Sequence, residues 1–124
     1  MRSRRSTSRR AGTISAINLK EGMPRVDEAL AVMQRAVATA RTERRDVIKF
    51  IHGYGSSGEG GDIRIAVQKR LREMESTGEL RACIFGEDWS PSDARTWALL
   101  KARPELKSDP HLGKRNLGIT VVVI

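Results

Sequence analysis

Apolar residues along this chain recur with two periods, one typical of strands and one typical of helices. Residues 47–51 (VIKFI) are apolar almost throughout, which favours a central strand or a strand covered on both faces. Residues 14–19 alternate apolar and polar side chains, and residues 82–85 form a short apolar run. Residues 118–124 are rich in β-branched side chains, which favour strands. The pattern therefore predicts four strands.

Two longer segments repeat apolar residues every three or four positions, as on one face of a helix. The first helix is expected to begin after Pro24 and to end near Thr42. The second is expected to begin at Asp62, a good N-cap, and to end at Gly78. Its outer face is expected to carry Arg64, Gln68 and Arg72, with Lys69 nearby. A shorter third helix is expected after Ser92.

The order of these elements predicts one α/β domain over residues 13–124. Strands that alternate with helices are typical of parallel sheets joined by right-handed crossovers. A chain of 124 residues is long enough to bury one core. Before the last strand, Trp89 is expected to anchor its segment, and the helical spacing of Trp97 favours packing on the core.

The net charge of +8 is concentrated at the start of the chain. Residues 1–10 contain five arginines and no acid, whereas the remaining residues hold 18 basic and 15 acidic side chains. Because residues 1–12 contain few apolar groups, a disordered basic tail is expected there. The tail is either an arm that grips nucleic-acid phosphates or a solvated segment without a partner, and charge alone does not decide between them.

Cysteine content and hydropathy indicate a cytoplasmic protein. The single cysteine, Cys83, cannot form an internal disulfide, and its apolar surroundings favour a small core residue. No apolar stretch approaches the roughly 20 residues of a membrane span, so no membrane partner is expected. The basic start lacks the apolar region that would follow in a signal peptide.

The strand over residues 47–51 ends in His52, and five glycines follow within residues 53–61. Ligands tend to bind outside the carboxyl ends of strands in α/β sheets, and a glycine loop before a helix presents N–H groups that suit a phosphate. His52 could bind that phosphate or transfer a proton near neutral pH. Lys49 and Tyr54 flank it, and the tyrosine ring can stack on a base. The alternative is a flexible loop whose histidine binds backbone.

Other chemistry-bearing residues are expected to be structural. His111 fits a turn, and two histidines and one cysteine far apart in sequence do not make a metal site. The glycine loop matches neither a Walker A loop nor the dinucleotide fingerprint. Four acidic residues are expected to be solvated rather than a paired acid/base set: Glu87, Asp88, Asp93 and Asp109.

The strand end IHGYG (residues 51–55), with the glycine loop and helix that follow, resembles the second motif of the small MutS-related (Smr) domain family. Residues 17–20 (INLK) fall where that family has a Leu-Asp-x-His motif on its first strand. Residues 26–30 (VDEAL) resemble its Val-Glu-Glu-Ala-Leu helix start, and residues 119–122 resemble its closing strand.

The resemblance covers about residues 14–85 and 117–124. It implies an α+β sandwich, a βαβαβ(α)β two-layer fold with a four-stranded mixed sheet, similar to the C-terminal domain of a bacterial translation initiation factor. Residues 86–116 and the tail lie outside the family pattern, which indicates a stand-alone bacterial member with an insertion. Smr domains bind nucleic acid, and some members nick DNA or cleave RNA.

Carried onto this chain, the second motif falls on His52, Gly53, Tyr54 and Gly55. The first motif departs from the family, because Asn18 replaces its aspartate and Lys20 replaces its histidine. Asn18 cannot serve as a carboxylate base or metal ligand. Lys20 can neutralise a phosphate, but a lysine ammonium group is a poor proton shuttle near neutral pH.

The sequence is compatible with two functions, and a third is more distant. The first is a nucleic-acid-binding domain that contacts phosphates through the HGYG loop and through His52, Lys20, Lys49 and Arg64. The second is an endonuclease in which His52 is the general acid or base and Lys20 and the loop amides stabilise the pentavalent phosphate. Mg²⁺ is considered only for this second function, and no cofactor is predicted otherwise. The third is binding of a small phosphorylated ligand.

Binding is favoured over cleavage, because binding survives the loss of the first motif more easily than catalysis does. The expected partner is DNA or RNA, with the ribosome as a further candidate.

Overall fold

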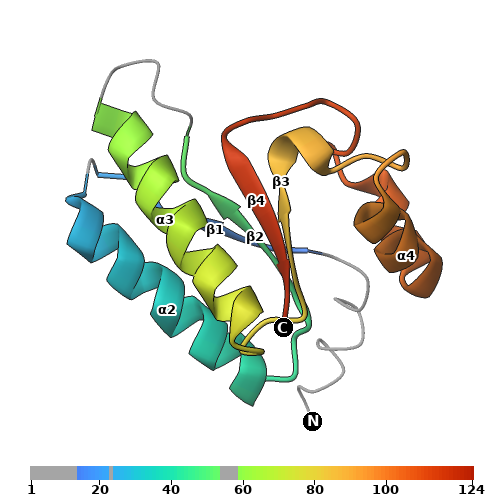
Figure 1. The fold of residues 1–124 in the computed structure, drawn as a ribbon, viewed down its shortest axis with the longest axis horizontal. Helices are drawn as coiled ribbons and strands as arrows, with labels where there is room; N and C mark the ends of the chain where they lie inside the picture. The colour runs from blue at the N-terminus through green and yellow to red at the C-terminus, as the bar shows by residue number, and fades with distance from the viewer. Residues whose placement is uncertain (1–13, 23, 54–58) are drawn as a thin grey trace, which may run out of the picture.

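A computed structural model describes residues 14–22, 24–53 and 59–124, and its centre is a four-stranded sheet with helices on both faces (Figure 1). The strands are β1 (Ser15–Asn18), β2 (Val47–Ile51), β3 (Ala82–Phe85) and β4 (Ile119–Val123). The helices are α2 (Val26–Thr42), α3 (Glu59–Ser76) and α4 (Ala94–Ala102), with short 3-10 helices η1 (Gly86–Asp88) and η2 (Pro104–Ser108). The expected basic tail, residues 1–12, lies outside the described residues.

The elements lie where the hydrophobic pattern predicts them, with shifts at two helix starts. Helix α3 begins at Glu59 rather than at Asp62. The N-cap of α4 is Asp93 rather than Ser92, because the Asp93 carboxylate accepts a hydrogen bond from the Thr96 N–H at 2.9 Å.

The sheet is mixed, with the strand order β1-β2-β4-β3. Strand β2 is parallel to β1, and β4 is antiparallel to both β2 and β3, so the first three strands run in one direction and β4 runs against them. The expectation of an all-parallel sheet is therefore wrong for β4. The mixed sheet implied by the Smr resemblance is confirmed.

The reversal of β4 follows from the path of residues 86–118. A Cβ atom built on Gly86 would lie only 1.8 Å from the carbonyl oxygen of Asn116. The chain therefore leaves the carboxyl end of β3 and returns to β4 at that same end of the strands. A strand that begins at the end of the sheet where the previous strand stopped must run antiparallel to it.

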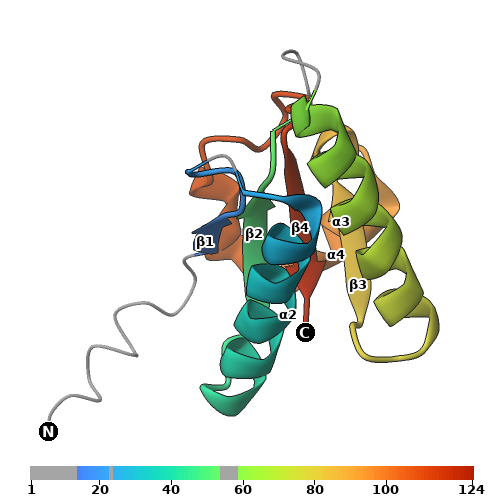
Figure 2. The same cartoon turned by 90° about the vertical axis from the view of Figure 1, so that its left-hand side faces the viewer.

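Helices α2 and α3 lie side by side on one face of the sheet, and α4 lies behind it (Figure 2). The helices present buried residues at three- and four-residue spacing to Ile48, Phe50 and Val122 of the sheet. These helix residues are Ala29, Met33, Val37 and Ala40 on α2, and Ile63, Val67, Leu71 and Met74 on α3. Each large side chain buried there stabilises the fold by about 1.5–3 kcal/mol.

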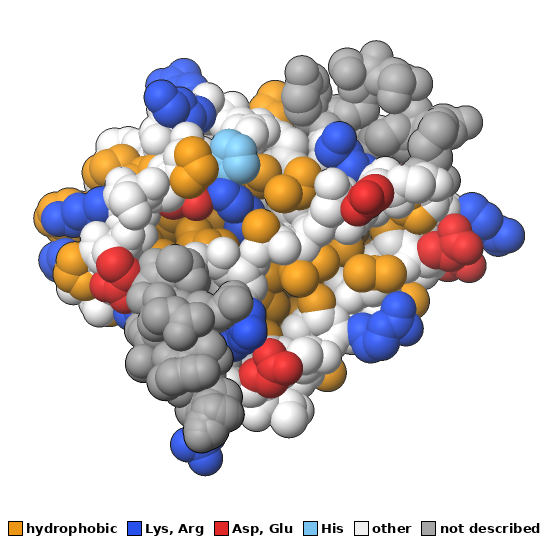
Figure 3. Space-filling model, turned by 180° about the vertical axis from the view of Figure 1, so that it is seen from behind, with side chains coloured by type: hydrophobic (Ala, Val, Ile, Leu, Met, Phe, Trp, Pro, Cys, Tyr) orange, Lys and Arg blue, Asp and Glu red, His pale blue; other side chains and the backbone are white. Residues whose placement is uncertain are grey.

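Residues 86–116 cover part of the opposite face. Trp89, Leu100 and Leu106 pack there against Val47, Ile84, Ile119 and Val121. Trp89 is fully buried, which confirms that it anchors this segment. Viewed from behind, this side of the molecule shows hydrophobic side chains gathered among scattered charged ones (Figure 3).

Trp97 does not pack on the core as expected, because its side chain is 44% exposed.

Cys83 is buried, as expected of a core residue, and burial raises the pKa of its thiol to about 12. Every helix in the described part of the chain is too short or too polar to serve as a membrane span.

Candidate functional site

The carboxyl ends of β1 and β2 bring the two candidate motifs together. Parallel pairing places Asn18 beside Ile51, and the N–H of Leu19 donates to the carbonyl of Ile51 at 2.7 Å. The next residue on that side, Lys20, lies over Gly53: a Cβ atom built on the glycine would be 3.1 Å from Cδ of the lysine. The exposed Lys20 side chain is therefore placed at the first residue of the glycine loop.

Gly53 needs to be a glycine for two reasons. Its φ is +74°, in the left-handed region that costs other residues roughly 1–2 kcal/mol. A side chain there would also press on the aliphatic stem of Lys20. The His-Gly pair thus ends the strand and turns the chain under the lysine.

The His52 ring is fully buried and is held by hydrogen bonds at both nitrogens. Nδ1 lies 2.6 Å from the carbonyl oxygen of Gly53, so Nδ1 carries the hydrogen and donates. Nε2 then accepts from the Thr120 hydroxyl at 2.9 Å, and that hydroxyl accepts from the Gln68 amide at 3.1 Å. This chain of three hydrogen bonds, the His52 relay, runs from α3 through β4 to the start of the loop.

Burial is the main reason that the pKa of His52 lies below its ordinary value of 6.5. The hydrogen bond to Gly53 opposes this shift, and the nearby positive charge of Arg64 reinforces it. The ring is therefore neutral near pH 7, and its Nδ1–H donates to the backbone of Gly53. The hydrogen bond to backbone that one interpretation of His52 expected is present.

Asn18 closes the turn that follows β1. Its Oδ1 accepts from the N–H groups of Lys20 at 2.9 Å and Glu21 at 3.0 Å. The side chain therefore fixes the backbone that carries Lys20, a role that an amide performs as well as a carboxylate.

Arg64 adds a second cation to this end of the sheet. It lies near the start of α3, it is half-buried, and it is close enough to His52 to lower that residue's pKa. Its Nε is buried and has no hydrogen-bond partner in the described part of the chain. Tyr54 and Gly55, the remaining residues of the second motif, lie outside the described residues.

A shallow groove of about 470 Å³ continues along α3 from this end, next to the edge strand β3. Its lining includes Gln68, Lys69, Arg72 and Phe85, and the Arg72 guanidinium lies 4.7 Å from the centroid of the Phe85 ring. The lining thus combines two cations, one aromatic ring and the carboxylate of Glu73, and the sequence pattern did not predict this groove.

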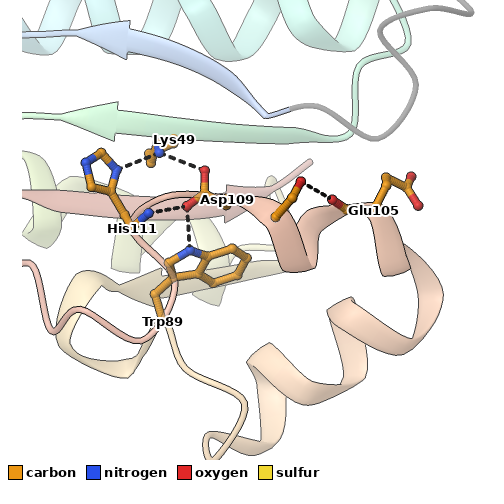
Figure 4. A network of polar contacts seen from close by, with 6 residues as sticks. Lys49, Trp89, Glu105, Asp109 and His111 are labelled. Atoms are coloured by element: carbon orange, nitrogen blue, oxygen red, sulfur yellow. Dashed lines mark hydrogen bonds and ion pairs between the residues drawn. The ribbon is translucent and has the colours of Figure 1, made fainter.

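Lys49 lies away from the loop, on the opposite face of the sheet (Figure 4). Side chains alternate along β2, so Ile48 and Phe50 face the helices while Lys49 points under residues 86–116. Its Nζ lies 2.8 Å from the Asp109 carboxylate and 2.6 Å from His111 Nδ1. Lys49 is therefore removed from the candidate phosphate contacts.

The same cluster corrects the expectation that Asp109 is solvated. Its side chain is 7% exposed and, besides Lys49, accepts from the Trp89 indole N–H at 3.0 Å and from the His111 N–H at 3.1 Å (Figure 4). His111 lies in a turn, as expected, and contributes both its backbone and its ring to the cluster.

Two members of the His52 relay were missed by sequence reasoning. Gln68 was expected on the outer face of α3 but is buried, because its amide reaches Thr120. The available signal was Thr120 itself, a polar residue within an otherwise apolar final strand. Within residues 14–22, 24–53 and 59–124, no three His, Cys, Asp or Glu side chains gather as a metal site would require.

The architecture has a counterpart among solved structures. The crystal structure of the Smr domain of Thermus thermophilus MutS2 aligns with this chain at a TM-score of 0.55, covering 89% of this chain and 96% of that one. The chain has the Smr fold. Sequence identity to that domain is 21%, so the likeness is one of fold. No protein-family model and no curated protein sequence matches the chain.

Proposed function

We propose that this chain is a nucleic-acid-binding domain of Smr type whose phosphate site lies at the joined ends of β1 and β2. The observation that carries the proposal is the placement of the exposed Lys20 over Gly53, beside the start of the glycine loop. The partner is DNA or RNA, including ribosomal RNA, in the cytoplasm. The HGYG loop, including Tyr54 and Gly55, supplies backbone N–H groups to the phosphate.

The charges at this end of the sheet support an anionic ligand. Lys20 and Arg64 form no ion pair with a carboxylate in the described part of the chain. Helix α3 begins at the same place, and the N-terminus of a helix favours negative charge. Lys20 and Arg64 are thus the side chains proposed to contact phosphates, with His52 holding the loop in position.

The geometry favours binding over cleavage. The His52 ring is fully buried and both its nitrogens are engaged, so it is poorly placed to exchange a proton with a phosphodiester. Asn18 and Lys20 supply no carboxylate or imidazole in its place. A nuclease using His52, with Mg²⁺ as cofactor, remains the second candidate only through the likeness of fold.

Binding is tested by fluorescence anisotropy with labelled single-stranded and duplex DNA and RNA over a range of salt concentrations. The wild type is expected to bind more weakly as salt rises. Lys20→Glu and Arg64→Glu are each expected to weaken binding and to reduce the magnitude of the salt slope by about 1. Arg35→Glu, a matched charge reversal at an exposed site on α2, is expected to have little effect. The proposal would be refuted if the affinity did not change with salt concentration, or if both site variants bound as tightly as the wild type.

Cleavage is tested in parallel on supercoiled plasmid and on RNA, with and without Mg²⁺. We expect intact substrate under all conditions. Cleavage by the wild type that is lost in both His52→Ala and Lys20→Met, with both variants folded by circular dichroism, would establish the nuclease instead.

A further inference from the structure

Trp97 is an exposed aromatic residue that the fold does not require for its core. The side chain is 44% exposed, whereas the other tryptophan, Trp89, is fully buried in the same segment. Trp97 lies on α4, within the residues 86–116 that fall outside the Smr motifs. An exposed tryptophan presents a flat aromatic surface on which the ring of a ligand can stack.

Two exposed lysines reach over the indole ring. The Lys101 Nζ lies 5.9 Å from the ring centroid and the Lys107 Nζ lies 6.0 Å from it, the first on α4 and the second on η2. Both ammonium groups lie over the ring at the outer limit of a cation–π contact, and the Trp97 side chain is nevertheless 44% exposed. We call Trp97, Lys101 and Lys107 the Trp97 patch.

The positive charge of the Trp97 patch is not neutralised by a carboxylate. Neither lysine forms an ion pair among the described residues, and Glu105, which lies between them in sequence, is engaged by Arg103 at 2.9 Å. The ligand that fits is therefore anionic, with a flat ring to lie on the indole.

We propose that the Trp97 patch is a second contact surface for nucleic acid, selective for single strands. A base stacks on Trp97 while Lys101 and Lys107 contact the phosphates on either side. Duplex bases are already stacked on their neighbours, so they do not offer a free face. The proposal rests on the proposed function for the identity of the ligand, but it uses different residues on the opposite side of the sheet.

Tryptophan fluorescence reports on this surface directly, because the chain has one exposed and one buried tryptophan. Titration of the wild type with oligothymidylate is expected to quench the emission. In Trp97→Phe only the buried Trp89 emits, so quenching is expected to disappear while binding is retained through the phenyl ring. Trp97→Leu keeps an apolar side chain but removes the aromatic face, and its affinity is expected to fall by about 5-fold to about 150-fold.

The lysines are tested separately with Lys101→Gln and Lys107→Gln. Each is expected to reduce the magnitude of the salt slope for oligothymidylate by about 0.7, the value for one phosphate contact on a single strand. Duplex affinity is expected to be nearly unchanged in all these variants. Arg81→Gln, at an exposed position before β3, is the matched control for loss of one charge.

The outcomes separate this proposal from the one on which it rests. If Lys20→Glu weakens binding but Trp97→Leu binds oligothymidylate as the folded wild type does, the Trp97 patch is not a contact surface and the proposed function stands. If polyglutamate quenches Trp97 and oligothymidylate does not, the surface belongs to an acidic protein and this proposal is overturned. If the wild type binds no nucleic acid at low salt, both proposals fail together.

Discussion

At the residue scale, His52 shows how burial changes the role of a side chain. A histidine between a strand and a glycine loop has the position of a catalytic residue. In the structure its two nitrogens bind Gly53 and Thr120, and its pKa lies below the ordinary value because the ring is removed from solvent. The ring binds the backbone of Gly53, and the exposed Lys20 over that glycine is the side chain we propose to contact a phosphate.

This burial predicts a pH dependence of stability. Well above pH 6.5 the histidine is neutral in both the folded and unfolded states, so it adds no dependence on pH there. Below that value the unfolded chain takes up a proton that the folded protein resists, so the free energy of unfolding falls as the pH falls. His52→Gln is expected to be less stable at pH 8, by about 1–3 kcal/mol, but less sensitive to acidification.

Urea unfolding at intervals from about pH 8 to about pH 5 measures this difference. His111→Gln is the comparison, because it removes the other histidine, which contacts Lys49 on the opposite face of the sheet rather than the partners of His52. It is expected to keep the part of the pH dependence that His52 causes. A His52→Gln variant that loses stability on acidification as steeply as the wild type would show that another group causes the dependence.

At the scale of elements, the path of residues 86–116 begins and ends at a close backbone contact beside Gly86. Gly86 follows β3 directly and begins η1, and the backbone of the returning chain at Asn116 passes close to it. Because of this close contact, the segment leaves β3 and joins β4 at the same end of the strands. Strand β4 then lies antiparallel between β2 and β3.

Gly86→Ala is therefore expected to destabilise the protein strongly. Its Cβ would lie 1.8 Å from the Asn116 carbonyl oxygen and 2.8 Å from that of Ile119, and both are backbone atoms that cannot rotate away. We expect a loss of about 3 kcal/mol or more in urea unfolding. Gly113→Ala is the comparison, since its φ of +78° costs about 1–2 kcal/mol but no atom lies within 4 Å. An equal or smaller loss for Gly86→Ala would mean that the backbone relaxes around the methyl group.

At the scale of the whole molecule, the two faces of the sheet are held in different ways. The face under α2 and α3 is held by apolar packing. The opposite face combines an apolar cluster with the buried Lys49–Asp109 pair, in which both side chains are at most 7% exposed. The ion pair thus ties residues 86–116 to the central strand.

Lys49→Met is expected to destabilise the protein by about 3–5 kcal/mol, because it leaves the Asp109 carboxylate buried without its cation. Removing both charges in Lys49→Met/Asp109→Leu is expected to cost less than the sum of the single changes. Arg70→Gln breaks a pair that is 38% and 51% exposed, and it is expected to cost at most about 1 kcal/mol. Chemical denaturation gives these values, and hydrogen exchange should show the loss in residues 86–116. Additive effects at Lys49 and Asp109 would show that the two side chains do not depend on each other.

Much of the fold could be predicted from the sequence, because its cause is local. The apolar run at residues 47–51 is the central strand β2, and the three- and four-residue spacing of apolar side chains gives α2 and α3. The Smr resemblance also placed the first and second motifs, and the structure brings Lys20 and Gly53 together. Helix starts were less certain, since α3 begins ahead of its best N-cap residue.

The sequence by itself thus determined the elements, the buried stripes and the position of the His-Gly loop, since each depends on neighbours along the chain. Only the tertiary structure decided which way polar side chains point. Lys49 and His52 are three residues apart, yet one lies under residues 86–116 and the other joins Gln68 and Thr120 on the helix face. Trp97 has the spacing of a core residue but is 44% exposed, with the ammonium groups of two lysines over its ring. Such partners are distant in sequence, and only packing brings them together.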